Sequence, residues 1–119
     1  MIPAAQLFSR ELHWARACIS FKGLMKKKTV SIIFGTRPEA IKLAPVILAM
    51  RKSPYFRCRV CVTAQHRQML DQVLEIFGIV PDVDLNLMKR NQSLASFTAR
   101  AITALDDYLG REKPDLILV

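Results

Sequence analysis

The alternation of apolar and polar positions from Lys28 onward predicts strands and helices in turn. The segments with the apolar or β-branched character of buried strands are 29–34, 57–63 and 115–119. The segments with apolar residues at helical spacing are 37–52, 67–77 and 94–111. Segment 81–92, which precedes the last predicted helix, is polar and rich in turn residues, with only brief alternation.

Each predicted helix carries one apolar face. The residues that form these faces are Ala40, Leu43, Ile47 and Met50 in the first helix, Met69, Leu70, Val73, Leu74 and Phe77 in the second, and Leu94, Phe97, Ala101, Leu105 and Tyr108 in the third. Gly78 stands where a left-handed C-terminal cap is expected, and Ser93 is the expected N-cap of the third helix. Pro45 lies inside the first helix, where we expect a kink.

The order strand, helix, strand, helix, helix, strand predicts an α/β fold, a Rossmann-like parallel sheet with right-handed crossovers. The last predicted strand should lead into another loop and helix, so we expect residues 26–119 to form a truncated amino-terminal domain. Residues 1–25 differ in character, because Arg10, Glu11 and Arg16 interrupt any signal-peptide core. We expect this stretch to be an extension without a role in the core; an amphipathic helix on a membrane or a partner is the alternative.

The basic charge of the chain is unevenly distributed. The net charge is +8 over 119 residues. Residues 1–28 carry six basic side chains and one acidic one, whereas the other 91 residues carry twelve basic and nine acidic ones. A nucleic-acid-binding protein should carry its basic face on the folded part, so we expect no nucleic-acid partner. No apolar run approaches the roughly 20 residues that a membrane helix needs, so we expect no membrane span.

The three cysteines, Cys18, Cys58 and Cys61, do not add up to an even disulfide framework. Cys58 and Cys61 have the C-x-x-C spacing of metal and redox sites. They fall in a predicted strand, however, where residues three apart point to opposite faces of the sheet. We therefore expect small buried thiols, no metal site, and a protein of the reducing cytoplasm.

The run from Phe34 to Lys42 carries the candidate chemistry. It leaves a predicted strand and opens a predicted helix, the place where doubly wound folds bind phosphates. A helix start offers backbone N–H groups and partial positive charge, and Arg37 adds a guanidinium suited to phosphate oxygens. Gly35, Thr36 and Arg37 are therefore the predicted phosphate-binding residues.

This run also has a purely structural interpretation. Gly35 can serve a tight turn or a close strand–helix approach, and Thr36 with Glu39 matches a capping box. Lys42 can pair with Glu39 on the helix surface. The fingerprints G-x-G-x-x-G and G-x-x-x-x-G-K-[ST] are absent from the sequence, which argues against NAD or ATP as the ligand.

Several motifs in register resemble one known family. The segments that carry the resemblance are 35–45 (GTRPEAIKLAP), 62–74 (VTAQHRQMLDQVL), 84–88 (DLNLM) and 113–119 (KPDLILV). Together they resemble the amino-terminal part of the non-hydrolysing UDP-N-acetylglucosamine 2-epimerases. The resemblance extends over nearly all of residues 29–119 and over none of residues 1–25.

The resemblance implies a two-domain protein of the glycosyltransferase-B type, with the substrate between two Rossmann-like halves. It implies that UDP-N-acetylglucosamine (UDP-GlcNAc) and UDP-N-acetylmannosamine (UDP-ManNAc) are interconverted by elimination and re-addition of UDP, with inversion at C2 of the sugar. Such a reaction needs acid–base groups at C2 and cationic or N–H donors for the departing diphosphate. The family implies no metal, nicotinamide or other cofactor, and homodimers of the full-length protein.

By the same resemblance, Arg37 matches the arginine that contacts the nucleotide phosphates. Lys42 matches a lysine near the reacting sugar and is the candidate catalytic residue; the alternative is that it orients Glu39. The main catalytic acids of the family, its catalytic histidine and its uridine-binding half would follow Val119, so the resemblance implies that the 119-residue chain is inactive alone.

The resemblance also implies a regulatory site for a second UDP-GlcNAc molecule. Gln65 and Gln68 correspond to contacts with that molecule in bacterial members, His66 lies between them, and Gln92 is a further candidate. The alternative for His66 is a polar residue at a helix start. The chain departs from the bacterial pattern at Asn91, which stands where an arginine is common.

Two other interpretations of the chain stay open at this point. The first is a non-catalytic fragment that binds phosphate or a nucleotide sugar. The second is a different nucleotide-sugar enzyme or glycosyltransferase that shares the same half-fold.

Overall fold

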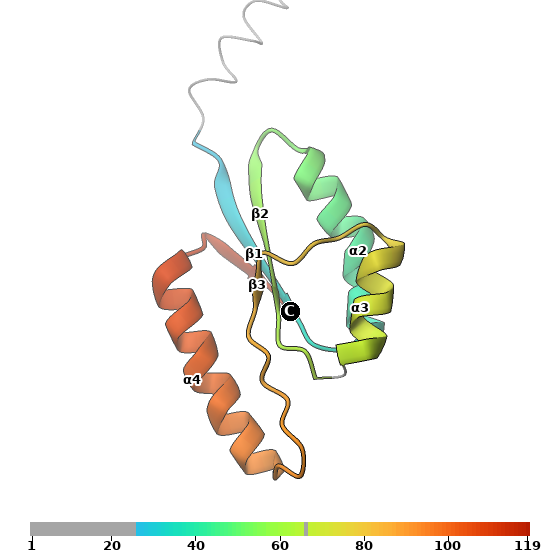
Figure 1. Ribbon diagram of the computed structural model, residues 1–119. Helices are drawn as coiled ribbons and strands as arrows, with labels where there is room; N and C mark the ends of the chain where they lie inside the picture. The colour runs from blue at the N-terminus through green and yellow to red at the C-terminus, as the bar shows by residue number, and fades with distance from the viewer. Residues whose placement is uncertain (1–25, 66) are drawn as a thin grey trace, which may run out of the picture.

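The computed structural model describes residues 26–65 and 67–119. Its elements are β1 (Lys28–Phe34), α2 (Arg37–Lys52), β2 (Phe56–Val62), α3 (Arg67–Ile76), β3 (Val83–Asp84), α4 (Leu94–Glu112) and β4 (Leu116–Leu118). Strands and helices alternate, and the three helices begin at the same end of the described part (Figure 1). The predicted extension, residues 1–25, and His66 lie outside the described residues.

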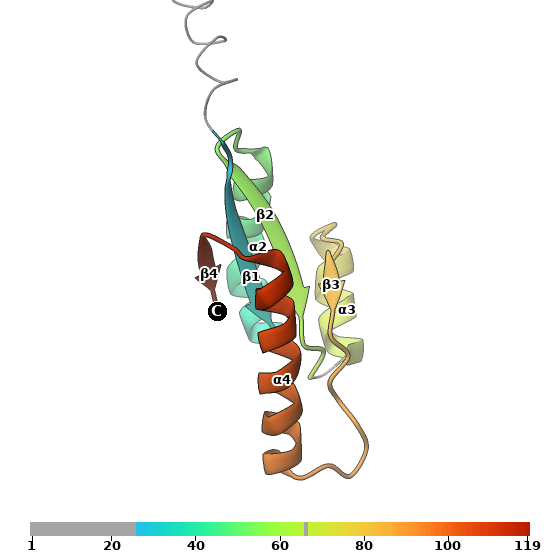
Figure 2. The same ribbon diagram turned by 90° about the vertical axis from the view of Figure 1, so that its left-hand side faces the viewer.

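The described strands form one parallel sheet in the order β3-β2-β1-β4, so that β1 lies inside it. β1 and β2 pair over their whole length, from Lys28 beside Phe56 to Phe34 beside Val62. Figure 2 shows α4 in front of the sheet, with β4 at one edge and β3 at the other. The Rossmann-like parallel sheet predicted from the sequence is confirmed.

β3 corrects the predicted order of elements. Segment 81–92 was expected to hold no strand, but Val83 and Asp84 pair with Cys61 and Val62 of β2. The strand is only two residues long, so its alternation does not stand out from the surrounding turn residues. The polar segment therefore returns to the sheet before α4 begins.

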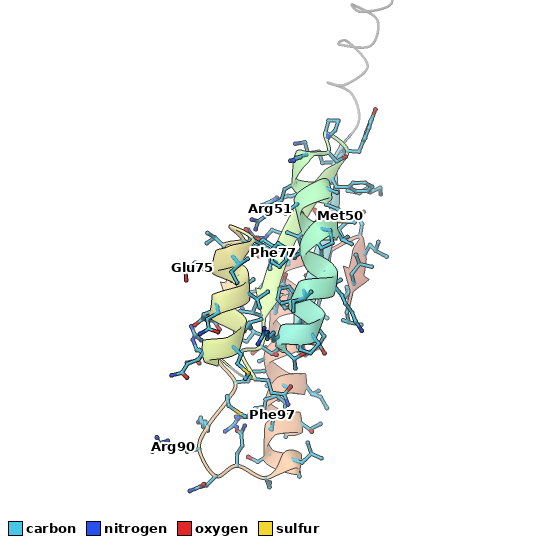
Figure 3. All side chains as sticks on the ribbon, turned by 90° about the vertical axis from the view of Figure 1, so that its right-hand side faces the viewer. Met50, Arg51, Glu75, Phe77, Arg90 and Phe97 are labelled. Carbon is cyan, nitrogen blue, oxygen red and sulfur yellow. The ribbon has the colours of Figure 1, made fainter. Side chains whose placement is uncertain are left out.

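Helices α2 and α3 cover one face of the sheet and enclose the larger apolar cluster. Its buried members are Val30, Ile32, Phe34, Ala40, Ala44, Ile47, Val60, Val62, Leu70, Val73, Leu74 and Ile79. Figure 3 shows Phe77 between α3 and α2, where it packs against this cluster. Each large apolar side chain buried here stabilises the fold by roughly 1.5–3 kcal/mol.

Helix α4 covers the opposite face with a smaller cluster. Ile33, Cys61 and Tyr108 are buried there. The hydroxyl oxygens of Tyr108 and Ser31 lie 2.6 Å apart in a buried hydrogen bond. This bond satisfies both hydroxyl groups, which would otherwise be costly to bury.

Two expectations about buried faces are wrong. Leu94 is 81% exposed, because it lies in the first turn of α4, which extends beyond the ends of the strands (Figure 1). Met69 is 53% exposed. It is turned by about 100° around α3 from Leu70, which is fully buried.

Other local expectations are confirmed. The Ser93 hydroxyl accepts the N–H of Ser96 at 3.1 Å, and Gly78 has a φ of 62°. Cys58 packs on the α2 side of the sheet and Cys61 on the α4 side, and both thiols are free. Cys61 is buried as expected, whereas Cys58 is only partly buried. Helix α2 continues through Pro45, and the kink there stays a prediction.

Charged side chains tie the layers together at the amino ends of the strands. Lys28 Nζ lies 3.0 Å from Asp115 Oδ1, beside β4. Arg59 of β2 donates two hydrogen bonds, of 3.1 and 2.9 Å, to Glu112 at the end of α4. It donates a third, of 3.1 Å, to Asp82 before β3. The Arg59 cluster (Arg59, Asp82 and Glu112) therefore joins β2, the segment before β3, and α4.

Candidate functional site

Three loops meet where the parallel strands end at their carboxyl sides. The N–H of Thr63 donates to the carbonyl of Phe34 at 3.0 Å. The N–H of Gln65 donates to the carbonyl of Gly35 at 3.1 Å. The N–H of Leu87 donates to the carbonyl of Thr63, also at 3.1 Å. These bonds continue the pairing of the strands and hold the phosphate turn (residues 35–37) against the loop after β2.

Gly35 is required by this close approach. It is buried, and a Cβ atom at its position would lie 2.0 Å from Thr63 Oγ1 and 3.4 Å from Thr63 Cβ. Such a distance is far inside van der Waals contact, so a larger residue displaces Thr63 or the turn. Gly35 therefore allows a close approach, but its partner is the loop after β2 and not the strand–helix contact that was expected. A direct phosphate contact by Gly35 stays a prediction.

The carboxylate of Glu39 accepts hydrogen bonds from backbone N–H groups at the start of α2. Its Oε2 accepts the N–H of Gly35 at 3.0 Å and the N–H of Thr36 at 3.1 Å. The predicted capping box of Thr36 and Glu39 is present. The hydrogen bond from Gly35, together with those from Thr36, holds the pKa of Glu39 below its ordinary value, although partial burial opposes the shift.

Arg37 and Lys42 are exposed cations on α2. Within residues 26–65 and 67–119, neither is in ion-pair contact with a carboxylate. The charge of Lys42 contributes to the low pKa of Glu39, but the backbone donors of Gly35 and Thr36 fix that carboxylate in place. Both cations therefore remain available to an anionic ligand.

Two of the predicted regulatory residues line the same cavity, which has a volume of about 250 Å³. The lining residues are Gln65, Met88, Gln92, Ser93, Leu94 and Phe97. The Gln92 amide nitrogen donates to Met88 Sδ at 2.8 Å, while its buried Oε1 has no hydrogen-bond partner in the described part of the chain. An amide oxygen in this state is a candidate acceptor for a ligand.

The remaining regulatory candidates are not brought together in this way. Gln68 is exposed on α3 and does not line that cavity. His66 lies outside the described residues. Asn91, where the chain departs from the bacterial pattern, follows the exposed Arg90 on the loop before α4 (Figure 3).

The loop between β2 and α3 holds one residue in a strained conformation. Ala64 has a φ of 56° and is 2% exposed. Residues with a Cβ atom adopt this left-handed region at a cost of about 1 kcal/mol. The backbone hydrogen bonds of Thr63 and Gln65, on either side of Ala64, hold the conformation in place.

The sequence interpretation missed Thr63, Met88 and Phe97. Thr63 was part of a recognised motif, but its contact with Gly35 depends on the register between β1 and β2. Met88 and Phe97 face Gln65 because the segment after β3 returns to the site. A conspicuous glycine after a strand is the one signal that pointed to a close neighbour.

Metal binding and membrane insertion find no support in the described part of the chain. Among residues 26–65 and 67–119, no group of three or more His, Cys, Asp and Glu side chains is placed to hold a metal ion. None of the helices in these two ranges is both long and apolar enough to cross a bilayer.

Burial raises the pKa of the Cys61 thiol to about 11, so it stays protonated at neutral pH.

Comparison with known proteins decides the family. The family model described as UDP-N-acetylglucosamine 2-epimerase matches residues 48–119, more than half of the chain. The chain belongs to the UDP-N-acetylglucosamine 2-epimerase family. The UDP-N-acetylglucosamine 2-epimerase of Escherichia coli K12 is 56% identical to it over 90 residues, which are 76% of this chain and 24% of the E. coli protein.

Solved epimerase structures share the fold. The Neisseria meningitidis UDP-GlcNAc 2-epimerase bound to UDP-GlcNAc is 55% identical, with a TM-score of 0.70 over 75% of this chain and 24% of that one. The Staphylococcus aureus MnaA–UDP co-structure is 49% identical, with a TM-score of 0.73 over 77% of this chain and 24% of that one. The chain thus spans about a quarter of the length of these epimerases.

Proposed function

We propose that this chain supplies one wall of the substrate cleft of a UDP-N-acetylglucosamine 2-epimerase. The reaction interconverts UDP-GlcNAc and UDP-ManNAc by elimination and re-addition of UDP. One observation supports this most: Arg37 and Lys42 are exposed and have no ion-pair contacts among the described residues. They lie beside the turn that Gly35 fixes, in a chain that belongs to this family.

In this proposal, the guanidinium of Arg37 binds the diphosphate through charge-assisted hydrogen bonds. Lys42 lies about one helical turn further along α2 and is the candidate for a catalytic cation near the sugar. Gly35 and Thr36, the other predicted phosphate-binding residues, shape the turn beside Arg37, while their N–H groups donate to Glu39. No cofactor is needed, because elimination and re-addition of UDP require only acid–base and electrostatic catalysis.

The assembly around this wall is also proposed. Residues 26–119 form part of the amino-terminal Rossmann-like domain of a glycosyltransferase-B-type protein, and residues 1–25 are an extension of that domain. The full-length protein is a cytoplasmic homodimer. The relatives whose structures hold UDP-GlcNAc or UDP support the nucleotide sugar as the ligand.

The cavity lined by Gln65 and Gln92 is the proposed place of a regulatory UDP-GlcNAc molecule. Its volume of about 250 Å³ is below the usual size of a ligand pocket, so it would receive only part of the nucleotide sugar. The buried, unpartnered Oε1 of Gln92 is the described group best placed to accept a hydrogen bond from that molecule. Gln68 and His66 complete the proposed set.

The test of the proposed function is UDP binding to Arg37→Ala. Loss of the charge-assisted hydrogen bonds should weaken binding by about 1.5–3 kcal/mol, or roughly 10- to 100-fold, in an NMR or calorimetric titration. Lys52→Ala is the matched control, since Lys52 is an exposed cation at the opposite end of α2. An affinity unchanged by Arg37→Ala contradicts the proposal.

A second measurement addresses catalysis by the 119-residue chain itself. Incubation with UDP-GlcNAc should form no UDP-ManNAc, because we propose that the main acid–base groups lie on other parts of the protein. Binding of UDP without turnover fits the wall proposed here. Formation of UDP-ManNAc at a rate proportional to the chain's concentration would show that these residues suffice.

A further inference from the structure

We propose that Glu39 is the specificity residue of the phosphate turn. Its carboxylate accepts hydrogen bonds from the backbone N–H groups at the start of α2. The turn therefore favours a diphosphate that reaches Arg37 and Lys42 over a compact inorganic anion. This inference rests on the proposed function, because it concerns how the same turn selects its ligand. It adds a role for a residue that the sequence interpretation treated only as a helix cap.

The first step is the use of the backbone donors. A helix start with free N–H groups binds small anions such as phosphate or sulfate readily. Here the N–H groups of Gly35 and Thr36 donate to Glu39 Oε2, and the N–H of Ala40 donates to the carbonyl of Thr36. Pro38 has no N–H to offer. Most of the usual anion-binding donors are therefore already engaged within the protein.

The second step is the charge that the ligand meets. The pKa of Glu39 is held below its ordinary value, so the side chain is an anion at neutral pH. A phosphate ion at the helix start would lie directly against this carboxylate, and the repulsion falls as the separation grows. A diphosphate can lie further out, where the exposed side chains of Arg37 and Lys42 reach it.

The experiment compares inorganic phosphate and UDP as separate probes of the whole chain. Amide signals of Gly35 and Thr36 report the titrations in the unaltered protein, in Glu39→Gln and in Glu39→Ala. Glu39→Gln keeps an oxygen that accepts the two N–H groups, and Glu39→Ala frees them. Glu75→Gln is the control, because Glu75 is exposed on α3 and points away from α2 (Figure 3).

Both Glu39 variants should bind inorganic phosphate about fivefold more tightly at low ionic strength, with a smaller gain for UDP, since in this proposal the diphosphate is held mainly by the side chains of Arg37 and Lys42 and not by the helix start. The ratio of UDP affinity to phosphate affinity therefore falls, and Glu75→Gln leaves that ratio unchanged. Unchanged or weaker phosphate binding in folded Glu39 variants overturns the inference. Equal gains for both ligands overturn it as well.

Failure of the proposed function is distinguishable from failure of this inference. If UDP leaves the signals of Arg37 unmoved in the unaltered chain, the proposed function fails. The phosphate titrations alone still decide whether Glu39 occupies an anion site. Thermal unfolding of each variant confirms that the compared proteins are folded.

Discussion

The two ends of the one sheet differ in the cations that are left without a carboxylate partner among the described residues. At the amino ends of the strands, Lys28 pairs with Asp115, and Arg59 is shared between Glu112 and Asp82. At the carboxyl ends, Arg67 pairs with Asp84 and Asp71. Arg37 and Lys42, which lie at the same end, have no ion-pair contact with a carboxylate in the described part of the chain. Paired cations hold layers together, whereas cations without such contacts can bind a ligand.

Left-handed backbone is more frequent at the carboxyl end but occurs at both ends. Ala64, Asn86 and Asn91 have positive φ values of 56°, 45° and 54° and lie in loops at or beyond the carboxyl ends of β2 and β3. Lys113, with a φ of 42°, lies at the amino end, between α4 and β4. Ala64 is the one of these four that is buried, and it lies beside the phosphate turn.

Gly35→Ala should have the largest effect on stability and should disrupt the loops at the carboxyl ends of the strands. The new Cβ atom overlaps Thr63 Oγ1, so we expect a loss of about 2 kcal/mol in the free energy of unfolding, together with weaker UDP binding. Denaturant unfolding and a UDP titration measure the two effects. Gly110→Ala is the matched control, because nothing lies within 4 Å of its added Cβ in α4, and it should stabilise the chain by about 0.5–1 kcal/mol.

The double variant Gly35→Ala/Thr63→Ala sharpens this prediction. Removing Oγ1 makes room for the methyl group, so part of the lost stability should return. A double-mutant cycle with no coupling between the two positions would show that the overlap is not the cause.

Arg59→Met should have a smaller effect on stability, because it disrupts the Arg59 cluster and not the phosphate turn. The variant keeps much of the apolar stem but leaves Glu112 without its cation, so we expect a loss of about 1–1.5 kcal/mol. The loss should shrink at high salt, which screens partly exposed charges. UDP affinity should not change; a drop as large as that of Arg37→Ala would contradict the division between the two ends.

Ala64→Gly should give the smallest effect. Glycine adopts a φ of 56° without the Cβ penalty, but it loses more conformational entropy on folding and removes a buried methyl group, so we expect the free energy of unfolding to change by less than about 1 kcal/mol. Ala44→Gly in the middle of α2 is the control, because it also removes a buried methyl group but from a helical position, and it should destabilise by about 1 kcal/mol or more. Thermal unfolding of both variants decides; a loss at position 64 as large as that at position 44 shows that position 64 carries no strain.

Sequence patterns predicted the parts of the fold that local chemistry determines. Helix α2 has the predicted bounds, because Thr36, Glu39 and Ser53 mark its two ends. β3 could not be predicted, since a strand of two residues depends on pairing with β2 and not on its own composition. The exposure of Leu94 also depends on distant structure, namely how far α4 extends beyond the strands.

The candidate site divides in the same way. Arg37 and Lys42 were found from one continuous run. The cavity of Gln65 and Gln92 was expected only through resemblance, because its two sides come together when the segment after β3 folds back at Leu87. The hydrogen bonds from Gly35 and Thr36 to Glu39 were anticipated in part by the capping-box pattern, but their effect on anion binding needed the positions of the donors.

The place of β1 inside the sheet has a consequence for synthesis on the ribosome. One neighbour, β2, follows soon after β1 in the chain, but the other, β4, is joined to it through contacts such as Thr29 with Asp115, 86 positions apart. Until residues 116–118 are synthesised, β1 therefore has one edge uncovered and open to wrong pairing. A nascent chain of this protein is most exposed to aggregation in the interval before residues 116–118 leave the exit tunnel.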